Sequence, residues 1–124
     1  CTDVTGFGLL GHLTEMATES HQAITINQKQ VPVLPRVREL AEQGNIPSGS
    51  RNNLKQVKNV VHFDPRFDEI DQLILADAVT SGGLLMGVHE RDALSILDDL
   101  KQQGIDARVI GEVTDGTAGH IYVQ

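Results

Sequence analysis

Apolar residues in this sequence switch repeatedly between the three- and four-residue spacing of helices and the continuous or alternating spacing of strands. Helical spacing is found at residues 6–19, 32–44, 67–74 and 93–104. Strand-like segments lie at residues 23–26, 57–63, 84–88, 107–113 and 119–123. Elements of both kinds that alternate along one chain bury their apolar faces by stacking helices on a sheet. We therefore expect an α+β fold, a layered α/β sandwich.

Turn-forming residues divide these segments. Gly44 is expected to end the second helix as a left-handed cap, and residues 45–56 read as a surface loop or one short helix. The apolar run at residues 84–88 is typical of a buried strand. Asp115-Gly116 predicts a hairpin between the last two strands. The final strand, helix, strand and strand resemble part of a ferredoxin-like arrangement.

Length and composition narrow the function classes. The 124 residues suit a single domain, and no apolar run approaches the roughly 18 residues of a membrane helix. There are 17 Asp and Glu against 10 Lys and Arg, so the formal net charge is −7. Because this charge repels a phosphate backbone, nucleic-acid binding is not expected. One cysteine cannot form an internal disulfide, which fits a reducing compartment such as the cytoplasm.

The sequence starts at Cys1 rather than Met and shows no charged leader with an apolar segment. We expect a piece of a longer chain. A reaction that needs two domains would then be only half present in it.

The opening segment is the first candidate site. Asp3 and the hydroxyls of Thr2 and Thr5 stand just before Gly6, Gly8 and a predicted helix. A carboxylate suits a hard cation such as Mg²⁺, and glycines and a helix N-terminus suit a phosphate. On spacing alone, capping of the helix by Asp3 or Thr5 is the favoured alternative.

Two further loops are weaker candidates. The hydroxyls and glycines of Thr80, Ser81, Gly82 and Gly83 fit either a backbone anion nest or a plain tight turn. Arg51, in the loop from Ser48 to Asn53, could pair with a phosphate, but a solvated loop is favoured there.

The five histidines show no zinc-ligand spacing. A hydrogen-bonded helix histidine is favoured over a catalytic base for His12. Cys1 has no identifiable general base beside it, so we predict no catalytic residue in this chain.

Two motifs closely resemble the C-terminal domain of the selenophosphate synthetase (selenide, water dikinase) family. They are Thr2-Asp3-Val4-Thr5-Gly6-Phe7-Gly8-Leu9-Leu10-Gly11-His12-Leu13 and Asp77-Ala78-Val79-Thr80-Ser81-Gly82-Gly83-Leu84-Leu85. The resemblance implies the C-terminal-domain fold of the aminoimidazole ribonucleotide synthetase-like superfamily, a mixed sheet with partial ferredoxin-like topology. The sequence departs from the family pattern at Ala78-Val79, where Pro-Gln is usual, and at Ser48 and Ser50, where Gly and Thr are usual.

The same resemblance implies an enzyme that makes selenophosphate, AMP and orthophosphate from ATP, selenide and water. An N-terminal domain, absent here, would supply most of the ATP and Mg²⁺ site, the catalytic Cys or selenocysteine, a Lys and the homodimer contact. Asp3 matches a metal ligand of the family. The residues implied at the nucleotide site are Thr2, Gly6, Gly8, Thr80, Ser81, Gly82 and Gly83.

The resemblance therefore predicts a single domain, residues 1–124, of a two-domain enzyme, inactive when isolated. Two alternatives stay open. One is another ATP-dependent member of the superfamily, of the thiamine-monophosphate kinase or hydrogenase-maturation type. The other is a non-catalytic ferredoxin-like binding module.

Overall fold

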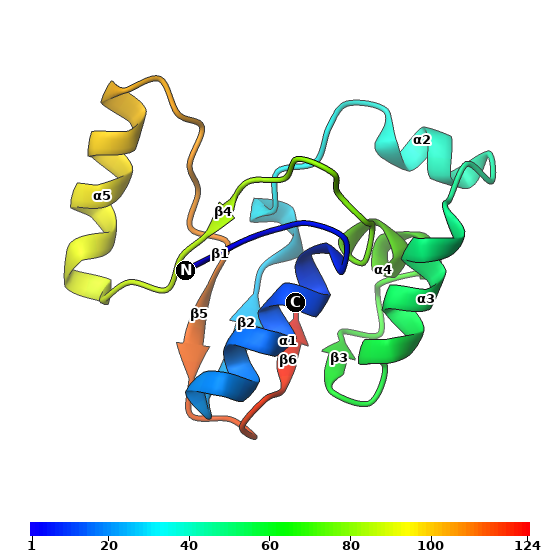
Figure 1. Ribbon diagram of the computed structural model, residues 1–124, viewed down its shortest axis with the longest axis horizontal. Helices are drawn as coiled ribbons and strands as arrows, with labels where there is room; N and C mark the ends of the chain where they lie inside the picture. Colours follow the sequence, from blue (N-terminus) through cyan, green and yellow to red (C-terminus); the bar gives the residue numbers. More distant parts are fainter.

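Helices and short strands alternate along the chain in the computed structural model, which describes all residues 1–124 (Figure 1). The helices are α1 (Gly8–Ser20), α2 (Val37–Glu42), α3 (Ser48–Val57), α4 (Glu69–Leu75) and α5 (Glu90–Gln102), with a 3₁₀ turn η1 (Gln28–Gln30). The strands are β1 (Thr2–Asp3), β2 (Ala23–Ile26), β3 (Val61–Phe63), β4 (Leu84–Leu85), β5 (Gly111–Thr114) and β6 (Ile121–Val123). The predicted α+β layered fold is confirmed. No helix is both long and apolar enough to cross a membrane.

Four strands form a mixed sheet in the order β3-β6-β2-β5. β6 runs parallel to both β2 and β3, and β5 is antiparallel to β2. The hairpin predicted at Asp115-Gly116 is wrong, because β2 lies between the two strands that this turn would join. Strand order depends on contacts between segments that are distant in the sequence, and a local turn motif does not indicate those contacts.

The core lies between α1 and one face of this sheet. Leu10, Leu13 and Ala17 on α1 pack with Ile26 and Ile121, and all five are buried. Figure 1 shows α1 lying across β2 and β6. Side chains alternate between the two faces of a strand, so the intervening positions Thr25, His62 and Tyr122 are only partly buried or exposed.

α3 corrects the prediction for residues 45–56: the ten residues Ser48–Val57 form a helix, so the segment is not mainly a loop. Its periodicity was hidden because two of its three buried residues are polar, Ser50 and Asn53, with Val57 as the third. Helix two is shorter than predicted. Arg36 takes a left-handed φ of 68°, so α2 begins only at Val37. Gly44, with φ 87°, follows its end as expected.

The segment after residue 83 is less buried than its composition suggests. Only Leu84 and Leu85 form a strand, which pairs with β1 instead of joining the main sheet, and Leu84 is 71% exposed. The predicted buried strand at residues 84–88 is therefore wrong. The predicted helix after it is confirmed as α5, but α5 buries none of its residues and stands apart from the body in Figure 1. Its Leu94 is 74% exposed.

Candidate functional site

The two sequence motifs lie side by side. Thr2 pairs with Leu85 and Asp3 with Leu84 in the antiparallel β1–β4 ladder. Beyond the ladder, the Val4 N–H donates to the Gly83 carbonyl at 2.9 Å, and the Val79 N–H donates to the Thr5 carbonyl at 3.1 Å. We call residues 2–8 and 77–85 the paired loops. Segments more than 70 positions apart in the sequence thus form one backbone unit.

Asp3 is exposed in the paired loops, and its carboxylate has no hydrogen-bond or ion-pair partner. The favoured expectation that Asp3 or Thr5 caps the first helix is wrong. Phe7 occupies the N-cap position of α1, and no side chain caps it. Thr2 is half-buried, and its hydroxyl donates to the Asp3 carbonyl at 3.2 Å. Asp3 is therefore a free carboxylate that the folded chain leaves available.

The glycines of the paired loops have two different roles. Gly8 has a φ of 68°, and a Cβ there would lie 2.6 Å from the Ala76 carbonyl oxygen. A Cβ on Gly82 would lie 2.0 Å from the Val4 carbonyl oxygen. Both positions are glycine because neighbouring backbone approaches closely. Gly6 and Gly83, by contrast, face open space on the Cβ side, so the surface there is accessible to a ligand.

Two buried side chains of α3 form hydrogen bonds with residues in and next to the paired loops. The Asn53 amide donates to the carbonyls of Gly6 and Ala76, at 2.8 and 3.1 Å. The Ser50 hydroxyl donates to the carboxylate of Asp77. Sequence reasoning missed both residues. The one available signal was an Asn and a Ser three residues apart, which share a helix face only if the segment is read as helical.

The remaining candidate site residues are those of the loop at residues 80–83 and Arg51. Thr80 and Ser81 are exposed in a bend, and neither Gly82 nor Gly83 has a positive φ, so the loop is not an αR-αL anion nest. Arg51 is exposed and lies 3.7 Å from the Glu69 carboxylate. Arg51 is solvent-exposed as expected, but it lies on helix α3 and not in the predicted loop.

His12 is buried and hydrogen-bonded at both ring nitrogens, as the favoured reading predicted. Its Nε2 lies 3.2 Å from the Thr5 hydroxyl, and its Nδ1 lies 3.0 Å from a carboxylate oxygen of Glu15. Thr5, in the paired loops, is thereby connected through α1 to the solvent-exposed Glu15.

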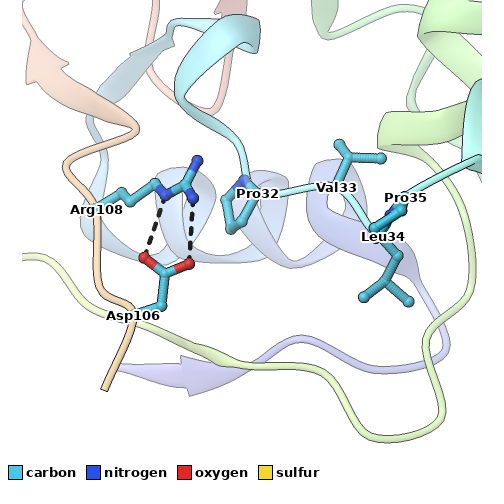
Figure 2. A pocket seen from close by; sticks show the side chains of 6 residues that line it. All are labelled: Pro32, Val33, Leu34, Pro35, Asp106 and Arg108. Carbon is cyan, nitrogen blue, oxygen red and sulfur yellow. Dashed lines mark hydrogen bonds and ion pairs between the residues drawn. The ribbon is translucent and has the colours of Figure 1, made fainter. Parts of the chain in front are cut away.

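Two hollows lie outside the predicted residues. One, of about 310 Å³, is lined by Pro32, Val33, Leu34, Pro35, Asp106 and Arg108 (Figure 2). In Figure 2 the Arg108 guanidinium closes one side through its ion pair with Asp106, at 3.1 Å. The second, of about 240 Å³, lies between α1 and α3 and is lined by Phe7, Gly11, Thr14, Glu15, Asn53, Gln56 and Val57. Neither contains Asp3 or a glycine predicted to contact a ligand.

No group of three or more His, Cys, Asp or Glu side chains in this chain is placed to hold a metal ion. The carboxylate of Asp3 fits Mg²⁺ chemically, because this ion prefers oxygen ligands, but it is one ligand of the several required. A cation at Asp3 would therefore need further oxygen ligands besides this carboxylate.

Comparison with known proteins gives a consistent result. Over residues 1–124 the chain matches the family described as AIR synthase related protein, C-terminal domain. It is 46% identical over 118 residues to the "Selenide, water dikinase" of Myxococcus xanthus (strain DK1622), covering 95% of this chain and 34% of that protein. The protein of the same name from Clostridioides difficile (strain 630) is 43% identical over 113 residues, 90% of this chain and 32% of that protein.

A third relative, the "Selenide, water dikinase" of Aliarcobacter butzleri (strain RM4018), is 37% identical over 125 residues, 100% of this chain and 36% of that protein. The chain therefore spans about a third of the length of the curated relatives it matches. Its closely paired motifs, its layered fold and the match over its whole length agree. The chain belongs to the AIR synthase related protein family, as a C-terminal domain of that family.

Proposed function

We propose that this chain is the C-terminal domain of an ATP-dependent selenide, water dikinase, which makes selenophosphate, AMP and orthophosphate from ATP, selenide and water. Its relatives carry that name, and its two motifs resemble that family throughout. The relatives are about three times as long, which supports a partner domain on the N-terminal side of the same polypeptide. The proposal includes a homodimeric, cytoplasmic enzyme.

The free carboxylate of Asp3 is the observation that carries this proposal. The chain has a net charge of −7, and ATP carries about four negative charges, so direct contact between them is repulsive. A Mg²⁺ ion between Asp3 and the phosphates would neutralise that repulsion and the charge that develops during phosphoryl transfer. Asp3 suits this role because no positive group of the chain occupies its carboxylate.

The rest of the paired loops would shape the surface around Asp3. Gly6 and Gly83 leave space for the partner domain or the nucleotide to approach the backbone. Thr80 and Ser81 have exposed side chains in the paired loops. The Thr2 hydroxyl donates to the backbone carbonyl of Asp3. Gly8 and Gly82 support the site by allowing the loops to pack closely. Phosphoryl transfer depends on such positioning and on charge neutralisation, so this chain alone is expected to be inactive.

Asp3→Asn in the longer protein tests the proposal. The substitution keeps the shape and removes the charge, so ATP- and selenide-dependent AMP formation is expected to fall roughly 100-fold with an unchanged Tm. Asp98→Asn is the matched control, because Asp98 is an exposed carboxylate on α5 without a partner. If Asp3→Asn keeps the same turnover as Asp98→Asn, the carboxylate does not belong to the site.

A further inference from the structure

His12 is the one buried histidine, and the proposed reaction gives it no role. It lies on α1, its side chain is 8% exposed, and the ring of Phe7 lies tilted against it at 5.6 Å between centroids. Glu15, three residues further along α1, contacts its Nδ1, and Thr5 contacts its Nε2. Since residues three apart share a helix face, α1 itself holds the carboxylate against the ring.

The protonation of the carboxylate and of the imidazole determines which group donates each of these hydrogen bonds. An ionised carboxylate only accepts hydrogen bonds, so the neutral imidazole must carry its proton on Nδ1, which donates to Glu15. Its Nε2 then has a lone pair and accepts. The Thr5 hydroxyl must therefore donate its proton to Nε2, which leaves only the lone pairs of its oxygen for any other contact.

We propose that Glu15 and His12 are positioning residues that hold Thr5 as a hydrogen-bond acceptor, so that its hydroxyl oxygen faces a divalent cation rather than a phosphate oxygen. The proposal deepens the proposed function and rests on it for the identity of the ligand. Thr5 stands two residues after Asp3 in the paired loops. With its proton committed to His12, its oxygen attracts a cation and repels a phosphate oxygen.

Backbone contacts keep Thr5 in place for this role. Its carbonyl accepts from the N–H groups of Gly8, at 3.0 Å, and Val79, at 3.1 Å. Thr5 thus joins the start of α1 to the second of the paired loops. Glu15, whose side chain is 57% exposed, lies at the outer end of the same chain of contacts. A substitution of Glu15 therefore changes the direction of the hydrogen bond at Thr5 without removing a buried side chain.

Glu15→Lys is the decisive variant. The lysine ammonium has no acceptor, so it can contact Nδ1 only as a donor. The imidazole proton then moves to Nε2, and Thr5 changes from donor into acceptor toward His12. In the longer protein, we expect affinity for Mn²⁺, a spectroscopic substitute for Mg²⁺ measured by electron paramagnetic resonance, to fall roughly 10-fold with little change in Tm. Glu19→Lys makes the same change of charge at an exposed and unpartnered position one turn further along α1, and it should bind Mn²⁺ like the unmodified protein.

Two substitutions at Thr5 separate its hydroxyl from its shape. Thr5→Ser keeps the hydroxyl and should keep the Mn²⁺ affinity, whereas Thr5→Val should lose affinity as Glu15→Lys does. Equal affinity in Glu15→Lys and Glu19→Lys would overturn the relay while leaving the proposed function intact, provided Asp3→Asn still weakens Mn²⁺ binding.

The imidazole ¹⁵N resonances of His12 test the relay without any ligand. We expect a neutral ring protonated at Nδ1 in the unmodified protein and at Nε2 in the Glu15→Lys variant. A proton on Nε2 in the unmodified protein would overturn the relay, whatever the metal measurements show. Unchanged Mn²⁺ affinity in Asp3→Asn would instead overturn the proposed function, so the two failures are distinguishable.

Discussion

Gly82 and Gly83 are neighbours in the sequence, yet the fold uses them differently. The backbone of Val4 lies so close to Gly82 that a Cβ there would be 2.0 Å from its carbonyl oxygen, and nothing lies within 4 Å of a Cβ on Gly83. The pairing of the two loops, and with it the position of Asp3, therefore depends on Gly82. Gly83 is the position that a ligand or a partner domain can approach.

Gly82→Ala is expected to lower the free energy of unfolding by about 1–3 kcal/mol, because the paired loops must separate to admit the methyl group. Urea denaturation followed by circular dichroism measures this change. Gly83→Ala is the matched control and should stay within about 0.5 kcal/mol of the unmodified protein. Equal stability of the two variants would contradict the close approach of the Val4 backbone.

The elements that periodicity predicted well are those whose buried faces are apolar. α1, β2 and α4 appear where the spacing of leucine, isoleucine and valine placed them. α3 was largely missed because hydrogen bonds to distant carbonyls and to Asp77, rather than apolar contacts, bury Ser50 and Asn53. The spacing of apolar residues within residues 48–57 does not indicate those distant hydrogen-bond partners.

Only part of the candidate site could be predicted from the sequence. The motifs and Asp3 could be chosen from the sequence, because carboxylate, hydroxyl and glycine together suit a metal-bridged phosphate. That residues 77–85 pair with residues 2–8 depends on the β1–β4 ladder, for which the sequence alone gave no signal beyond the family resemblance. The contacts of His12 with Thr5 and Glu15 depend on where the side chains point in the folded chain, which the order of residues in the sequence does not show.

α4 begins with a reciprocal capping box that also joins it to α2. The Asp68 carboxylate accepts from the Asp71 N–H at 2.8 Å, and the Asp71 carboxylate accepts from the Asp68 N–H at 3.2 Å. Arg38 on α2 donates to Asp68 at 2.7 Å and also contacts Asp71. The Asp71 N–H, followed by the Arg38 guanidinium, lowers the pKa of Asp68 below its ordinary value.

A lowered pKa in the folded state means that Asp68 stabilises the fold above its ordinary pKa, and that this stabilisation is lost as the pH falls through the folded value. Asp68→Asn keeps a capping side chain but removes the titrating charge. We expect its Tm to lie roughly 2–4 °C below that of the unmodified protein at pH 7, with the difference closing near pH 2.

Differential scanning calorimetry at several pH values measures this difference, and added salt should reduce it because the pair is exposed. Asp98→Asn, which removes an unpartnered carboxylate, should match the unmodified protein throughout. A constant gap between the Asp68→Asn variant and the unmodified protein from pH 7 to pH 2 would show that the charge of Asp68 does not contribute to stability.

At the scale of the whole molecule, the chain is an acidic domain with a net charge of −7, in which the carboxylate of Asp3 is exposed and has no ion-pair partner. Its relatives are about three times as long. The two hollows described above do not include Asp3, and no group of three or more His, Cys, Asp or Glu side chains of this chain is placed to hold a metal ion. These features fit the proposed arrangement, in which residues 2–8 of this domain contribute to a cation site that the rest of a longer protein completes.

Calorimetric titration with Mg²⁺ and ATP tests that claim most directly. The 124-residue chain, with its fold checked first by circular dichroism, is expected to release no measurable heat of binding. The longer protein should bind MgATP, and Asp3→Asn should weaken that binding. Micromolar binding of MgATP by the 124-residue chain alone would show that the site is complete within it and would contradict the account.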